Sequence, residues 1–285
     1  MGRLAALVLA VLVGACALAP WYAAHVSGMD PFRTNVLGAL PDGTPVLAAQ
    51  ELGVTPAGPT GRGAYLLGAD GLGRDVAARL LYGGRVSLGI ATAATVACLL
   101  LATALGVLAG YLAGAADAVI AGGLDLLWAF PVTLLAICLS AVLVGSSGGD
   151  SLALPAAILS IVYVPYVARP IRAEVAALRS AEFVTAARST GAGPWRILWR
   201  HVLPQLRGTL LAFLPLVAGM VLLTEASLSI LSVGVQAPHA SWGTLIADGQ
   251  ALLYTRPLVA IAPGLAVLVT VLALNTLAQS LGRRT

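Results

Sequence analysis

The sequence predicts an all-α membrane protein with six transmembrane helices and cytoplasmic N- and C-termini. Composition is the first reason: 59% of the 285 residues are hydrophobic and 10% are charged, as is typical of an integral membrane protein. The second reason is a set of six apolar stretches, close in length to the roughly 20 residues that a helix needs to cross the hydrocarbon. They cover residues 4–24, 86–114, 117–144, 152–168, 210–231 and 257–281.

Arginine placement is the third reason and sets the orientation. The chain has 16 arginines and no lysine, and residues 169–207 contain seven arginines with only two glutamates. Arg3, Arg283 and Arg284 lie near the ends. Basic residues favour the cytoplasmic side of a membrane, so we place this loop and both termini there. The missing lysine excludes a Walker A ATPase and a Schiff-base enzyme.

These features divide the chain into three regions. They are residues 1–24 as the first transmembrane helix, 25–85 as an extracytoplasmic segment with an interfacial helix, and 86–281 as a five-helix core. The core contains the cytoplasmic loop 169–207. No Cys pair and no His group has the spacing of metal ligands, so we expect no metal site and no catalytic residue.

The first apolar stretch has two interpretations. It follows a single arginine and ends at Pro20-Trp-Tyr, which favours a retained helix with an aromatic anchor. Val13-Gly-Ala-Cys16 also looks like a lipoprotein cleavage site, at which the preceding residues would be removed. Cys16, Cys98 and Cys138 all lie in apolar stretches, where small buried thiols are expected.

The extracytoplasmic segment is predicted to be irregular up to Gly73, because it is rich in Pro and Gly and has no long apolar run. Residues 76–88 are predicted to form a short amphipathic helix at the interface. In the helix that follows, Gly106, Gly110 and Gly114 recur every four residues. This spacing lets helices pack closely in lipid.

The cytoplasmic loop is predicted to form two helices joined by a glycine elbow. Residues 171–190 contain no Gly or Pro and favour a helix, which Gly191 ends with a backbone that needs positive φ. Pro194 suits the first turn of a second helix. Such an elbow projects from the membrane and fits a groove on another protein. The other interpretation is a basic amphipathic loop that lies on anionic lipid.

Two acids fall inside predicted spans. Asp125 lies in the third span, which we expect to kink near Pro131, and Glu225 lies in a fifth span interrupted by Pro215 and Gly219. Ionisable groups within the membrane are costly and often functional. We expect Glu225 to face a water-filled cavity or to bond to a neighbouring helix, and Asp125 to have a structural role or to relay protons.

Over residues 65–277 the chain resembles the permease subunits of ABC importers, in the dipeptide/oligopeptide/nickel branch. The cytoplasmic loop resembles the family's Glu-Ala-Ala, Gly and Leu-Pro pattern at Ala186, Ala187, Gly191, Leu203 and Pro204. Thr185 stands where the family has Glu, and His201 where it has Ile. A His at that position is usual in this branch, as is Glu182 one turn before Thr185.

Three further motifs agree with this resemblance. Residues 67–75 and 83–88 are similar to the branch's Leu-Gly-Thr-Asp, Gly-Arg-Asp and Gly-Ala-Arg-x-Ser-Leu strings. Residues 225–243 follow its Glu-Ala-Ser-Leu-Ser to Ser-Trp-Gly string almost throughout. The third pattern, Asp-x4-Arg-x2-Asp-x4-Phe-Pro, matches at Asp117, Asp125, Phe130 and Pro131, with Gly122 in place of the Arg. Asp125 is therefore expected to pair with another arginine or with water.

The resemblance implies a type I ABC importer permease that forms half of a translocation pore, with peptides as the expected substrate. Implied partners are a second permease subunit, two ATP-binding subunits (or one fused) and an extracytoplasmic binding protein. ATP and Mg would be bound by the partners, and this chain would need no cofactor. The implied sites are Glu182, Thr185, Ala186, Ala187, Gly191, His201, Leu203 and Pro204 for ATPase coupling, Glu225, Ser227 and Asp125 for the cavity or helix packing, and Asp70, Gly73, Arg74, Asp75 and Trp242 for docking of the binding protein.

Three alternatives remain open at this point. The same family also transports nickel chelates and other small solutes. A self-contained secondary transporter or channel would use Asp125 and Glu225, although the chain shows no inverted repeat. A membrane scaffold without transport activity is the third.

Overall fold

The computed structural model describes residues 1–40, 42–50, 53–61, 63–147 and 152–282. The described part is mostly helical and has one short antiparallel ribbon, in which β1 (Leu47–Gln50) pairs with β2 (Gly53–Pro56). The three longest helices are α3 (Val76–Leu112), α10 (Arg207–Ile230) and α12 (Leu258–Gly282). The others are α1 (Gly2–Ala17), α2 (Ala19–Tyr22), α4 (Gly114–Trp128), α5 (Val132–Ser147), α6 (Ala153–Val162), α7 (Val164–Arg179), α8 (Glu182–Ser189), α9 (Pro194–Ile197) and α11 (Trp242–Gln250). Arg283 and Arg284 lie outside the described residues.

The described helices provide between three and six candidate spans. Three are long and apolar enough by themselves, and three bent pairs qualify when each pair is taken as one span. The bends are 49° where α1 meets α2, 92° between α4 and α5, and 42° between α6 and α7. Pro131 lies at the sharpest bend, where sequence analysis predicted a kink. The kink is in fact a near-perpendicular break.

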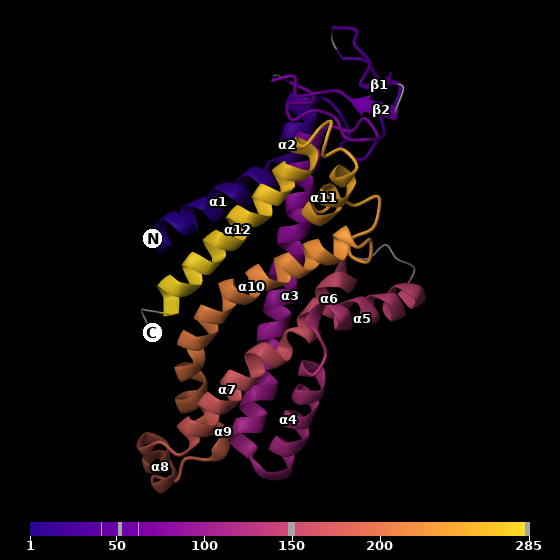
Figure 1. Cartoon of the computed structure of the whole chain (residues 1–285). Helices are drawn as coiled ribbons and strands as arrows, with labels where there is room; N and C mark the ends of the chain where they lie inside the picture. The colour runs from indigo at the N-terminus through magenta and orange to yellow at the C-terminus, as the bar shows by residue number, and fades with distance from the viewer. Residues whose placement is uncertain (41, 51–52, 62, 148–151, 283–285) are drawn as a thin grey trace.

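Helix α3 runs the length of the molecule and defines its two ends (Figure 1). We call them the β-ribbon end, which carries β1 and β2, and the α8 end, which carries α8 and α9. Helices α1 and α12 run side by side in opposite directions (Figure 1), so Gly2 lies against Ser280.

The core forms where α3 packs against α7 and α10. A Cβ added at Gly106 would lie 2.8 Å from the carbonyl oxygen of Ala168, and one at Gly110 would lie 2.6 Å from that of Arg172. The predicted role of these two glycines in close packing is confirmed. Gly114 differs, because it starts α4 with φ +62° and nothing lies near its missing side chain.

Three element boundaries differ from the predictions. The interfacial helix predicted at 76–88 is the first part of the continuous helix α3, whose 37 residues span about 55 Å, more than the roughly 30 Å hydrocarbon. The helix predicted over 171–190 is broken after Arg179, where Ala181 has an extended backbone with ψ 148°. The fifth span is not interrupted, because α10 continues through Pro215.

Candidate functional site

The α8–α9 elbow, residues 182–204, is the most protruding feature of the α8 end (Figure 1). Gly191 turns the chain with φ +84°, as predicted, and Pro194 begins α9. The elbow is anchored from below: Val184 and Ile197 are buried, and the Tyr111 hydroxyl of α3 donates to the carbonyl oxygen of Pro194 at 3.0 Å. A buried base thus supports an exposed tip.

The predicted coupling residues divide between that tip and the base. Glu182, Thr185, Ala186, Gly191 and Pro204 are exposed, whereas Ala187, His201 and Leu203 are partly buried. The ring of His201 lies 6.5 Å from that of Phe183, which links the two helices of the elbow. Glu182, Thr185 and Ala186 are exposed on α8, and Gly191 is exposed just after it, so these residues are available to another protein.

The Asp70 cluster, formed by Asp70, Arg74, Arg79 and Asp248, lies at the β-ribbon end. The Asp70 carboxylate is fully buried, pairs with Arg79, and accepts from Arg74 Nε at 2.8 Å. Both arginines also reach Asp248 of α11, at 3.1 Å from Arg74 and 2.9 Å from Arg79. The cluster joins the irregular segment, the start of α3 and α11.

Asp75 is buried beside this cluster. Its carboxylate caps α3 by accepting from the backbone N–H of Ala77 at 2.9 Å, and it accepts from the Ser27 hydroxyl at 2.5 Å. The Tyr65 hydroxyl accepts from Asn35 at 2.8 Å and donates to the carbonyl oxygen of Gly73 at 2.9 Å. Burial raises the pKa of the Tyr65 phenol.

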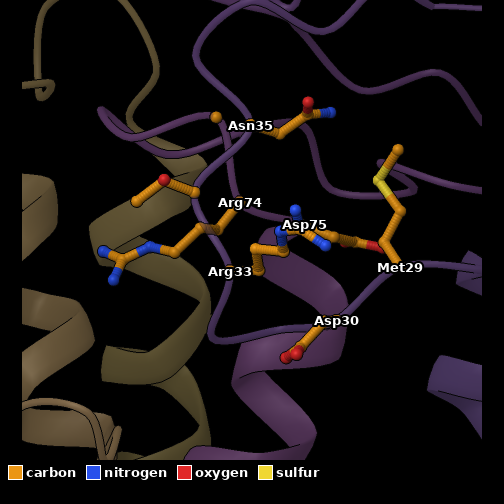
Figure 2. Close-up of a pocket in the computed structure, with 8 residues that line it drawn as sticks. Met29, Asp30, Arg33, Asn35, Arg74 and Asp75 are labelled. Carbon is orange, nitrogen blue, oxygen red and sulfur yellow. The ribbon is translucent and has the colours of Figure 1, made fainter.

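A polar pocket of about 320 Å³ opens next to Asp75 at the β-ribbon end. Figure 2 shows Met29, Asp30, Arg33, Asn35, Arg74 and Asp75 around it. Arg74 extends toward the C-terminal part of the chain, where it pairs with Asp248. The pocket therefore combines charges of both signs on a surface held by the Asp70 cluster.

Burial restricts the predicted docking residues. The side chains of Asp70, Asp75 and Trp242 are at most 1% exposed, so they cannot touch another protein directly in this structure. Arg74 is partly exposed. Gly73, with φ +73°, packs on the backbone of Asn35. These residues support the surface from beneath, whereas Asp30 and Arg33 are exposed on it.

Glu225 is buried inside the chain. Its carboxylate accepts from the Ser87 hydroxyl of α3 at 2.9 Å and from the Ser229 hydroxyl of α10 at 2.8 Å. Ser87 in turn accepts from the backbone N–H of Trp242 at 3.0 Å, and the Trp242 indole donates to the carbonyl oxygen of Leu80 at 3.0 Å. We call this network the Glu225 cluster; it fastens α3, α10 and α11 together.

Within this chain Glu225 bonds to the neighbouring helix α3, as one of the two expectations had it, and a cavity between two permease subunits stays a prediction. Ser227 lies on the exposed side of α10, and its hydroxyl bonds only locally, to the carbonyl oxygen of Leu223 at 2.8 Å. Asp125 pairs with another arginine, as expected: its Oδ1 lies 2.5 Å from Nη2 of Arg169 in α7.

The partners in these clusters were not predicted from the sequence. Ser87 and Glu225 stand 138 residues apart, and Asp70 and Asp248 meet only through shared arginines. The available signal was that the motif strings at 67–88 and 225–243 each contain charged and hydroxyl side chains. Pairing those strings with each other would have suggested the contacts.

The long apolar helices indicate a multi-pass membrane protein. A solved methionine ABC transporter, MetNI in inward-facing conformations, contains a chain that aligns with a TM-score of 0.58 at 19% identity, over 72% of this chain and 93% of that one. Residues 102–285 match the family model described as binding-protein-dependent transport system inner membrane component. The chain belongs to this family, and it is a permease subunit of an ABC importer and not itself an enzyme.

Two bacterial relatives are transport system permease proteins by name. The glutathione transport system permease protein GsiD of Pectobacterium atrosepticum is 39% identical over 76% of this chain and 71% of its own length. The di/tripeptide transport system permease protein DppC of Pseudomonas aeruginosa is 33% identical over 98% of this chain and 86% of its own length.

Proposed function

We propose that the chain crosses the cytoplasmic (inner) membrane six times, with both termini and the α8 end in the cytoplasm. Each bent helix pair then counts as one span, which is the upper number that length and composition allow. The seven arginines of residues 169–207 support this orientation, because basic residues stay on the cytoplasmic side. The β-ribbon end then faces outward.

The exposed tip of the α8–α9 elbow carries the proposed coupling function. Glu182, Thr185 and Arg188 stand out from a helix whose base is fixed by Val184, so the elbow can enter a groove on an ATP-binding subunit without unfolding. ATP and Mg would be bound by two such subunits, or by one fused chain. This chain would need no cofactor.

The rest of the molecule would transmit the movement of the ATPases as a rigid body. Helix α3 is packed tightly on α7 and α10, and the Glu225 cluster locks α3 to α10 and α11. Closing and reopening of the ATPases would therefore tilt these helices together against a second permease subunit, with which this chain forms the pore. Substrate would reach the pore from a binding protein docked at the β-ribbon end.

Peptides are the proposed substrate class. The relatives named above transport glutathione and di- or tripeptides by their printed names.

Co-purification with the ATP-binding subunits tests the coupling role. We expect Glu182→Arg to lower recovery of the ATPase about tenfold, because it reverses the charge of an exposed acid at the interface. Asp30→Arg makes the same charge change on the opposite end and is the matched control. Equal recovery with the two variants would show that the elbow is not the contact.

A further inference from the structure

An apolar groove lies between α3 and α10 at the α8 end. Its cavity is about 510 Å³, and its walls are the α3 stripe from Leu99 to Leu108, the α10 residues Leu210, Leu211 and Leu214, and Trp195 and Trp199 of the elbow. The two tryptophans are each 68% exposed. Thr103 contributes the one hydroxyl to the lining. Such a groove favours a long apolar ligand.

Three arginines stand close in the sequence to residues that line this groove. Arg207 stands three, four and seven residues before the three leucines of α10, so it lies on the same helix face, nearer the α8 end. Side chains on a helix tilt toward its N-terminus, which directs Arg207 away from the apolar lining. Arg196 and Arg200 follow the two tryptophans by one residue each. All three arginines are exposed, and none forms an ion pair within the described residues.

This order of groups matches one half of a lipid bilayer. Apolar walls come first, then indole rings, which favour the membrane interface, then unpaired positive charge, which attracts anionic headgroups. We propose that the groove binds one anionic phospholipid, with an acyl chain between α3 and α10 and its phosphate at Arg196, Arg200 and Arg207. The inference rests on the proposed topology, because that topology places these arginines at the cytoplasmic leaflet.

A bound lipid at this place would join the elbow to the transmembrane helices. Trp195 and Trp199 belong to the elbow, whereas the other two walls belong to α3 and α10. The acyl chain would fill the space that separates them, and the headgroup would neutralise three like charges that otherwise repel.

Native mass spectrometry of the full chain released from nanodiscs tests the site. The probe is a bilayer of equal parts phosphatidylglycerol and phosphatidylcholine. We expect phosphatidylglycerol to be retained preferentially, and Arg196→Gln/Arg200→Gln/Arg207→Gln to lower that preference about tenfold. The control Arg3→Gln/Arg33→Gln/Arg188→Gln removes the same charge from exposed positions elsewhere and should keep it. Equal retention by both triple variants would overturn the proposal.

A second pair of variants tests the groove itself. Ala104→Trp would fill the groove, whereas Leu101→Trp enlarges an exposed side chain of α3 outside it. Only the first should reduce lipid retention. Unchanged retention in Ala104→Trp would overturn the lipid proposal, and cross-linking of Trp199→Cys to a second permease subunit would show that a protein covers the groove instead. Lipid retention is measured without the ATPase. A failure of the coupling proposal in the co-purification experiment therefore does not change the outcome of the lipid test.

Discussion

At the β-ribbon end, Asp70, Asp75, Glu225 and Trp242 are buried within this chain, whereas at the α8 end Glu182 and Gly191 lie on the surface. Both groups belong to strings that resemble one family. The difference teaches that a motif marks positions where few residue types are tolerated. The motif alone does not say whether contact with a partner or packing inside the chain sets that restriction. Folding free energy should depend on the first group, and coupling on the second.

The strongest test of this contrast is Asp70→Ala. It removes a fully buried carboxylate that pairs with Arg74 and Arg79, and it leaves Arg79 with Asp248 alone. Breaking a buried ion pair by deleting one partner is costly, so we expect a loss of about 3 kcal/mol in the free energy of unfolding. Chemical unfolding in detergent measures it. Asp42→Ala, at an exposed position, is the control, and equal effects would contradict the structural role of the cluster.

Glu225→Ala should have the next largest effect. It leaves the hydroxyls of Ser87 and Ser229 without their acceptor, which costs about 2 kcal/mol for buried groups. Glu225→Gln keeps the shape and an acceptor, so it should fold normally and support transport at close to the parent rate. Transport that fails in a well-folded Glu225→Gln would show that the charge itself has a function, as in a cavity.

Tyr65→Phe is expected to lose about 1.5 kcal/mol, because the hydroxyl bonds to Asn35 and Gly73. Tyr254→Phe, at a fully exposed position, is the control. Since burial raises the pKa of Tyr65, its contribution is complete below the pKa of the unfolded chain, about 10. It is lost as pH rises through the higher folded value. The alkaline decline in stability should therefore be smaller in Tyr65→Phe; an unchanged decline would contradict this.

The helices themselves were largely predictable, because long apolar stretches in this chain have few alternatives to spanning helices. The elbow was also predictable, since its geometry depends on local residues: Gly191 needs positive φ and Pro194 starts a helix. The break after Arg179 was not predictable, because Ser180 and Ala181 are both compatible with a helix. The change of direction depends instead on the packing of Val184.

The clusters could not be predicted from the order of residues alone. Asp248 lies 169 residues from Arg79, and only the packing of α11 against α3 brings them together. Retention of residues 1–15 also stays a prediction, which the intact mass of the purified protein tests. A species that begins at Cys16 would lack most of α1, because that helix covers Gly2–Ala17. Cys16 itself packs against Gly84 of α3.

Gly191→Val is expected to change folding free energy least and coupling most. Gly191 has φ +84°, and nothing lies within 4 Å of an added Cβ, so the cost comes from the backbone alone. It should be about 1 kcal/mol, confined to the elbow. Gly193→Val is the matched control, because nothing lies near that position either but its φ is −67°, which valine adopts readily.

The measurement is ATP turnover and uptake by the assembled transporter. We expect Gly191→Val to bind the ATPases weakly or to hydrolyse ATP without uptake, while the unfolding midpoint stays near that of the parent. Gly193→Val should behave as the parent does in both assays. If the two variants lose coupling equally, bulk at the tip matters and the left-handed turn does not; if neither loses it, the exposed elbow is not where force enters the membrane helices.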